Sequence, residues 1–177
     1  GLDYKNPHLS PYEEFQRFKL HPKIKHNFEG GRRVSYGARA LNEGGFQSLP
    51  KLSFPGGAIL GCDAGTLNTP KIKGTHTAMK SGMIASDLVF KELISDSRND
   101  EISNLNKSFM NSWAGQELKN ARNVRPSFKY GLKIGMMLSG IDQIIFRGKA
   151  PWTLKHAEED HLASVSYTHL TLPTKEG

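Results

Sequence analysis

Glycines and small polar residues between positions 59 and 82 have the types and spacing to bind an electron-rich ligand. These residues are Gly61, Cys62, Asp63, Gly74, Thr75 and His76. The first three follow a short apolar run, and the last three open a segment with helical periodicity. A glycine turn lets the backbone approach a ligand closely, and a helix start offers free N–H groups and the positive end of its dipole. The alternative is an ordinary strand–turn–helix connection that binds nothing.

Two side chains in this stretch have competing interpretations. Cys62 is the single cysteine among 177 residues. Because it follows an apolar run, we expect an inert small residue rather than a redox thiol. One cysteine also excludes an internal disulfide and a cysteine-ligated metal site built from this chain alone. His76 could donate a hydrogen bond to a ligand or could simply pack, and the sequence leaves both open.

Several short segments read as strands and turns. Residues 33–40 alternate in the manner of a strand, and residues 46–50 resume the pattern after Gly44-Gly45. The Pro-Gly-Gly sequence within residues 54–57 predicts a turn. The apolar run at residues 58–61 predicts a short strand of the buried, parallel type.

Helical periodicity marks the remaining segments. Residues 11–18 predict a short helix with Pro11 in its first turn and Ser10 as its N-cap. Residues 75–95 and about 101–122 predict two longer helices. Trp113 belongs to the apolar stripe of the second, so we expect it in the core rather than as an electron relay.

Composition restricts the class of protein. The chain is 37% hydrophobic and 23% charged, which is a globular balance, and its formal charge is +7. A basic protein favours anionic lipid or an acidic protein as partner, although a solvated basic surface is the alternative. Nucleic acid is the weakest candidate because no run of five basic residues or nucleic-acid-binding signature occurs. We therefore expect no nucleic-acid partner.

The glycine-rich stretch resembles the second flavin-binding segment of the glutathione-reductase-like FAD fold. In that fold a Gly-Asp pair ends a strand, and a later glycine opens a helix beneath the isoalloxazine. Gly61 and Gly74 match the two glycines. Cys62 stands where most of the superfamily has Asp, so the resemblance implies that Asp63 or backbone N–H groups meet the ribityl chain. A flavin needs donors at its N1–C2=O edge, where reduction places negative charge.

A wider set of motifs carries a more specific resemblance. They occupy residues 36–48, 50–52, 54–57, 70–82 and 151–156. Together they look like the electron transfer flavoprotein–ubiquinone oxidoreductase family, and the likeness runs from residue 1 to about His161. The family implies FAD, a 4Fe-4S cluster and ubiquinone, with electrons passing from reduced electron transfer flavoprotein to ubiquinone in the respiratory chain, downstream of fatty acid oxidation.

The resemblance also implies that this chain carries only part of that machinery. It lacks the Gly-rich fingerprint for the FAD pyrophosphate and the four cluster cysteines, so we expect no metal ligands here. We expect an internal piece that is inactive alone. In the family the Gly-Gly after Asn-Glu lines the quinone pocket, which gives Gly44 and Gly45 that role. The alternative for these glycines is a simple hairpin bend.

The third predicted helix, about residues 128–146, is apolar on nearly every side and is flanked by lysines and arginines. Such a helix suits a membrane interface, with Met137, Ile141 and Ile145 as membrane-facing residues. A buried core helix is the alternative. The apolar run is too short to span a bilayer, which takes roughly 20 residues. The resemblance implies monotopic attachment, to the bacterial cytoplasmic membrane or the matrix face of the mitochondrial inner membrane.

The expected fold is therefore α/β, of mixed α and β elements. Residues 1–54 would form part of a ubiquinone-binding domain, and residues 55–97 the C-terminal segment of a FAD-binding domain. Residues 98–161 would form a helical, membrane-facing segment, whereas residues 162–177 fit no family pattern and look out-of-frame or vector-derived. Two alternatives remain: a geranylgeranyl-reductase-like or hydroxylase-type FAD enzyme acting on a lipid, and a non-catalytic membrane-binding module.

Overall fold

The computed structural model describes residue 6, residues 8–95 and residues 99–157. These residues fall into two compact units, which divide between Ala40 and Leu41. The atypical tail predicted at residues 162–177 lies outside the described residues.

The first unit contains two short helices, α1 (Pro11–Lys19) and α2 (Pro22–Lys25). Ser10 caps α1, because its side-chain oxygen accepts a hydrogen bond from the Glu13 N–H. The predicted helix and its cap are confirmed. The aromatic face of α1, which includes Phe15, is exposed in this unit.

The strand predicted over residues 33–40 is wrong. Residues 31–45 have no regular secondary structure, and Val34 and Tyr36 are exposed. An alternating pattern forms a strand only where a neighbouring strand pairs with it, and no described residue does so here. The segment after Gly45 is likewise a 3-10 helix, Phe46–Ser48, rather than a strand.

One small antiparallel hairpin is formed by β1 (Ser53–Phe54) and β2 (Gly57–Ala58), with Ser53 opposite Ala58. The predicted turn between them is confirmed. The predicted buried parallel strand over residues 58–61 is wrong: the chain pairs with β1 for two residues only and turns at Gly61, whose φ is +63°. A hydrogen bond joins the hairpin turn to a segment much later in the chain: the Gly56 N–H donates to the Asp100 carbonyl at 2.8 Å.

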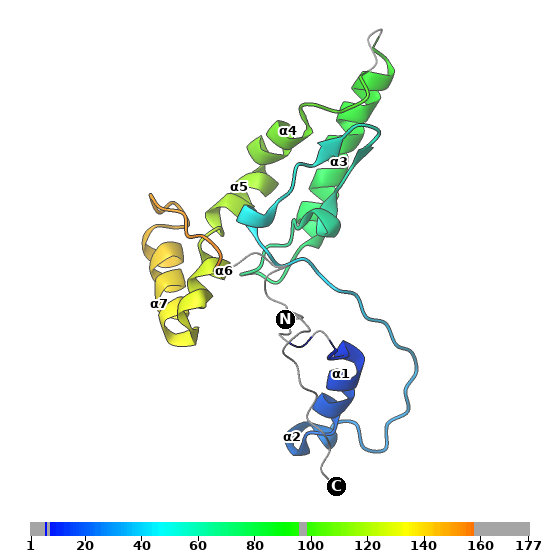
Figure 1. Cartoon of the computed structure of the whole chain (residues 1–177), viewed down its shortest axis with the longest axis vertical. Coiled ribbons are helices and arrows are strands. Elements are labelled where there is room, and N and C mark those ends of the chain that lie inside the picture. Colours follow the sequence, from blue (N-terminus) through cyan, green and yellow to red (C-terminus); the bar gives the residue numbers. More distant parts are fainter. Residues whose placement is uncertain (1–5, 7, 96–98, 158–177) are drawn as a thin grey trace. The chain divides into compact units, whose positions relative to one another are not determined.

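The largest element is α3 (Thr75–Leu93), which confirms the helix predicted at residues 75–95. The helices α4 (Leu105–Asn111) and α5 (Trp113–Asn120) pack against it, as Figure 1 shows. The core between these elements is formed by Leu52, Ala64, Ala85, Leu105, Phe109, Ala114 and Leu118. Apolar burial of this kind is the main source of stability for a domain of this size.

The helix predicted over residues 101–122 is interrupted at Ser112. The Ser112 backbone is extended, with φ −73° and ψ 163°, and its side chain caps α5 by accepting the Gly115 N–H. A side chain at Gly115 would collide with the Phe109 carbonyl and the Met110 backbone, so glycine permits the tight corner. The break turns Trp113 outward. The prediction of Trp113 as a core residue is wrong, because 52% of its surface is exposed.

The region predicted as one helix at residues 128–146 consists of three pieces. A 3-10 helix, Phe128–Tyr130, follows the short α6 (Val124–Ser127). Gly131, with φ +88°, separates it from α7 (Leu132–Gly140), which continues as a π-helix over Ile141–Ile145. Glycine alone readily adopts this backbone conformation. Among the helices of the described residues, none is both long and apolar enough to cross a membrane.

The described fold is therefore mixed but mostly helical, with a single two-stranded sheet. The sequence correctly placed α1 and α3 because each can form from local periodicity, but it missed the breaks at Ser112 and Gly131. It overestimated the strands because a strand depends on partners that lie elsewhere in the chain.

Candidate functional site

The glycine turn at residues 61–65 is a 3-10 helix (Gly61–Ala64) that packs on the first two turns of α3. The Gly61 N–H donates to the Ser81 hydroxyl oxygen at 3.0 Å, and the Thr77 hydroxyl lies 2.6 Å from the Thr66 carbonyl oxygen. The turn therefore holds Cys62 and Asp63 beside the start of α3. Cys62 is half-buried and Asp63 is exposed.

The start of α3 has no side-chain cap. Gly74 is the N-cap residue, and the first intrahelical backbone bond runs from the Ala78 N–H to the Gly74 carbonyl at 2.9 Å. The N–H groups before Ala78 have no partner within the helix itself. The donor set at Thr75 and His76, with the positive helix end, fits an electron-rich edge such as that of a flavin.

The packing around position 74 also favours glycine there, which the sequence did not reveal. A Cβ at this position would lie 2.9 Å from Leu67 Cδ1 and 3.4 Å from the Leu67 Cα. The close approach of the 66–68 segment to the helix start therefore leaves no room for a side chain at position 74 unless the Leu67 side chain moves, whether or not a ligand is bound. Two buried hydroxyl oxygens, Thr66 Oγ1 and Thr69 Oγ1, have no hydrogen-bond partner in this segment.

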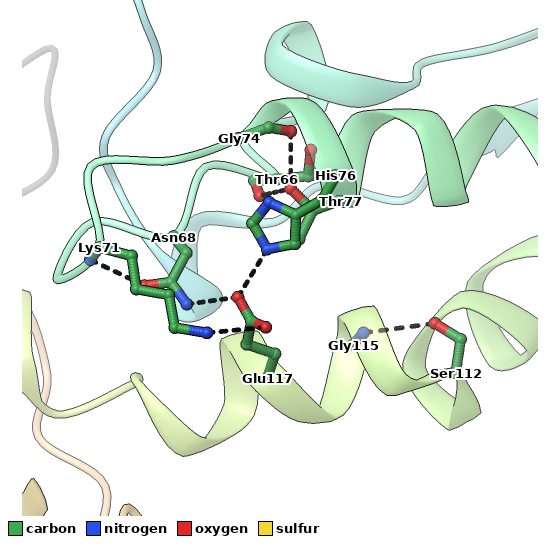
Figure 2. A network of polar contacts seen from close by, with 9 residues as sticks. All are labelled: Thr66, Asn68, Lys71, Gly74, His76, Thr77, Ser112, Gly115 and Glu117. Atoms are coloured by element: carbon green, nitrogen blue, oxygen red, sulfur yellow. Dashed lines mark hydrogen bonds and ion pairs between the residues drawn. The ribbon is translucent and has the colours of Figure 1, made fainter.

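A carboxylate from α5 joins this site (Figure 2). Glu117 Oε1 lies 2.8 Å from His76 Nε2 and accepts from Asn68 Nδ2 at 2.7 Å, and Oε2 lies 3.0 Å from Lys71 Nζ. Burial alone would raise the pKa of Glu117, but the hydrogen bonds from His76, Lys71 and Asn68 and the charge of Lys71 lower it to about 2. Glu117 is therefore a carboxylate throughout the physiological range.

The loop between Asn68 and Lys73 is closed by backbone hydrogen bonds in both directions, at 2.9 and 3.3 Å. Asn68 Oδ1 also accepts the Lys71 N–H at 3.2 Å. At its tip, Ile72 has φ +51°, which is unfavourable for a β-branched residue. The His76 ring also stacks on Trp113, with ring centroids 5.8 Å apart.

Sequence reasoning identified His76 but missed Glu117. The two residues are 41 positions apart, so no local motif joins them. The one available signal was the spacing of Trp113 and Glu117, which are i and i+4 on α5 and therefore share a face. In this structure Nε2 of His76 is engaged by Glu117, and the contribution of α3 to a ligand would come from its backbone N–H groups.

Gly44 and Gly45 precede the 3-10 helix Phe46–Ser48. Gly45 has φ +77° and ψ −165°, a region almost restricted to glycine. A side chain on Gly44 would collide with Ser48. Gln47 fixes the segment, because its Nε2 donates to the Arg122 and Leu154 carbonyls at 2.7 and 2.8 Å.

The second glycine lines a small pocket with a volume of about 10 Å³, between the 67–70 segment and the end of α5. This pocket is far below the roughly 300 Å³ of a typical ligand site. The segment that carries Gly44 and Gly45 also approaches the glycine turn at residues 61–65: a Cβ built on Gly65 would lie 3.5 Å from Asn42 Nδ2. The two predicted sites therefore lie close together within the second unit.

The Pro-Trp-Thr-Leu-Lys-His motif at residues 151–156 is held by two neighbouring side chains after α5. Asn123 Nδ2 donates to the Trp152 carbonyl at 3.1 Å, and Asn123 Oδ1 accepts the Leu154 N–H at 2.8 Å. Arg122 donates to the carbonyls of Gly148, Ala150 and Trp152. Arg122 and Asn123 thus fold the end of this segment back onto the helices.

The segment predicted as a membrane-interface helix buries a charged residue and exposes several apolar ones. Its inner side carries Gly135 and the buried Asp142, which accepts a hydrogen bond from Asn123 Nδ2 at 3.2 Å. Its outer side carries Met137, Ile141 and Ile145, with exposed fractions of 58%, 36% and 69%. In the described structure this segment therefore presents an exposed apolar face.

Comparison with known proteins shows which proteins this chain is similar to. Residues 1–41 match the family described as "ETF-QO, ubiquinone-binding". The mitochondrial electron transfer flavoprotein-ubiquinone oxidoreductase of Sus scrofa is 53% identical over 167 residues, covering 90% of this chain and 27% of that protein. The Oryza sativa subsp. japonica protein of the same name is 54% identical, covering 93% and 28%. The Arabidopsis thaliana one is 51% identical, covering 100% and 28%.

The chain is thus homologous to a segment of a class of oxidoreductases. The family is that of the electron transfer flavoprotein–ubiquinone oxidoreductases, and the resemblance read from the sequence motifs is confirmed. The chain spans a little over a quarter of the length of the relatives it matches.

Proposed function

We propose that this chain is part of an oxidoreductase that takes electrons from reduced electron transfer flavoprotein and delivers them, through FAD, to ubiquinone. The observation that carries the proposal is an identity of 51–54% over at least nine-tenths of the chain with proteins named for that reaction. Those relatives are mitochondrial by name, which supports the inner membrane as location. A 4Fe-4S cluster, if present, would be held by cysteines outside this chain, which has only Cys62.

The proposed flavin contacts come from the turn and helix start already described. Bound FAD would supply the electron-transfer chemistry. The uncapped N–H groups of Thr75 and His76 would stabilise negative charge at the N1–C2=O edge. Gly61 and Cys62 would bring the backbone near the ribityl chain, and the exposed Asp63 would offer its carboxylate to the ribityl hydroxyls.

The proposed quinone contacts are backbone groups of two glycines. The match of residues 1–41 to a ubiquinone-binding family supports ubiquinone as the ligand. Gly44 and Gly45, just beyond that range, would line the pocket with backbone groups, as the resemblance implies. The positive φ of Gly45 supports this role, because a position restricted to glycine keeps side-chain atoms out of the approach path.

The proposed membrane contact is the outer face of α7 and the π-helix. Its exposed apolar residues would enter the interface, while the surrounding cations, including Lys133 and Lys149, would face anionic headgroups. This arrangement would allow ubiquinone to be drawn from the bilayer.

The test uses a full-length protein that contains this segment. Purified protein should show flavin absorbance, its flavin should be reduced by reduced electron transfer flavoprotein, and the reduced enzyme should then be oxidised by a ubiquinone analogue. Flavin that electron transfer flavoprotein cannot reduce would favour a lipid-modifying FAD enzyme. A protein that binds membranes without any flavin would favour the non-catalytic module.

A further inference from the structure

We propose that Glu117 is a positioning residue for the flavin edge: it holds the Asn68–Lys73 loop and the first turn of α3 in the arrangement that directs the N–H groups of Thr75 and His76 toward the cofactor. This role rests on the proposed FAD site. It deepens that site by assigning to a helix remote in sequence the task of fixing its geometry.

The geometry of the carboxylate carries the proposal. Glu117 stands on α5, and its two oxygens contact three side chains from two other segments: Asn68 and Lys71 from the loop, and His76 from α3. Figure 2 shows the carboxylate between these partners, with the loop and the helix start on the same side. A single side chain therefore joins three parts of the chain around the helix start.

The loop needs such an anchor because its own conformation is unfavourable. Ile72 is 80% exposed and adopts φ +51°, so no burial of its side chain offsets the strain at the loop tip. The strain persists only where the surroundings fix the loop. Within the described residues, the loop is held internally by the Asn68–Lys73 pairing and the Lys71 N–H to Asn68 Oδ1 bond, and from outside by the contacts of Asn68 and Lys71 with Glu117.

The Glu117 carboxylate, which holds the loop, is also charged throughout the physiological pH range. The carboxylate receives three donors, which hold its pKa far below the usual range despite partial burial. Charge-assisted hydrogen bonds of this kind are shorter and stronger than neutral ones. Because His76 is the second residue of α3, its bond to Glu117 fixes the direction of the helix start itself.

The experiment compares Glu117→Gln with Glu101→Gln in the full-length protein. Glu101 is a matched control: like Glu117 it pairs with a lysine, Lys51 at 2.6 Å, and accepts a second side-chain hydrogen bond, from Ser53 at 2.9 Å, but it lies by the β1–β2 hairpin. Three quantities are measured in each: the FAD dissociation constant, the flavin midpoint potential and the thermal unfolding midpoint of the apoprotein. The glutamine keeps the shape of the side chain but removes its charge.

Glu117→Gln should raise the FAD dissociation constant about tenfold, which corresponds to about 1.4 kcal/mol. It should also lower the flavin midpoint potential, because misdirected N–H donors stabilise the reduced flavin less. Glu101→Gln should leave both unchanged. An unchanged midpoint potential together with an FAD dissociation constant within twofold of wild type in Glu117→Gln would overturn the role.

Should Glu117→Gln fail to fold, Lys71→Met serves as the second variant, since it removes one donor and leaves the carboxylate in place. It should weaken FAD binding in the same direction, and unchanged binding would overturn the proposal. A wild-type protein without flavin would instead overturn the proposed function, and this role with it. The two failures are therefore distinguishable.

Discussion

Replacing Met137, Ile141 and Ile145 with glutamine should release the full-length protein from membranes. These three side chains lie on the outer, apolar side of α7 and the π-helix, opposite the buried Asp142. Since they are substantially exposed in the described structure, polar replacements should not remove core packing from this segment.

The magnitude follows from their exposure. The exposed fractions of 58%, 36% and 69% amount to somewhat more than one and a half whole side chains. Transfer of a whole side chain of this size from water is worth roughly 1.5–3 kcal/mol, so the three exposed portions contribute roughly 2–5 kcal/mol. The membrane partition coefficient should therefore fall roughly 50-fold to several-thousand-fold.

The assay is sedimentation with vesicles that contain anionic lipid, at fixed ionic strength. The matched control replaces the same three residues with leucine, which preserves the apolar area and should preserve binding. Reduction of a water-soluble quinone analogue is measured in parallel, and the glutamine variant should retain it if the helix only docks the enzyme.

Two results would refute the reasoning. If the glutamine variant sediments with vesicles as well as the leucine variant does, this face does not contact the membrane. If it loses flavin and unfolds while the leucine variant does not, the helix is covered by other parts of the full-length protein and belongs to a core.

Three further predictions follow from the described sites. Gly45→Val should block quinone reduction with flavin content intact, since it adds a side chain at a φ of +77° with a backbone cost of about 1–3 kcal/mol; equal loss of flavin would point to misfolding instead. Gly74→Ala should lose FAD, and the added Leu67→Ala, which relieves the 2.9 Å contact, should not restore it; restoration would show that packing alone requires the glycine. Because the pKa of Glu117 falls from an ordinary 4.5 to about 2 on folding, its stabilisation, at most about 3 kcal/mol, is present above pH 4.5 and lost as the pH falls toward 2. Thermal unfolding should therefore be more acid-sensitive in wild type than in Glu117→Gln, and parallel pH curves would contradict this.

The sequence by itself determined the features that depend on neighbouring residues. Ser10 followed by Pro11 predicted the start of α1, and apolar periodicity predicted α3. The glycines that resemble a flavin-binding segment and the family motifs also lie in continuous stretches, so they could be recognised from the sequence alone. These signals are local because helices satisfy their hydrogen bonds within a few residues.

The tertiary structure alone decided where strands fail and which distant groups meet. Residues 33–40 alternate like a strand but have no described partner, and the single break at Ser112 turns Trp113 from the core to the surface. Glu117 reaches His76 across 41 residues, so its role could not be read from either segment. Strand pairing and ion pairs between distant segments depend on how the chain folds back on itself, and a one-dimensional pattern does not contain that information.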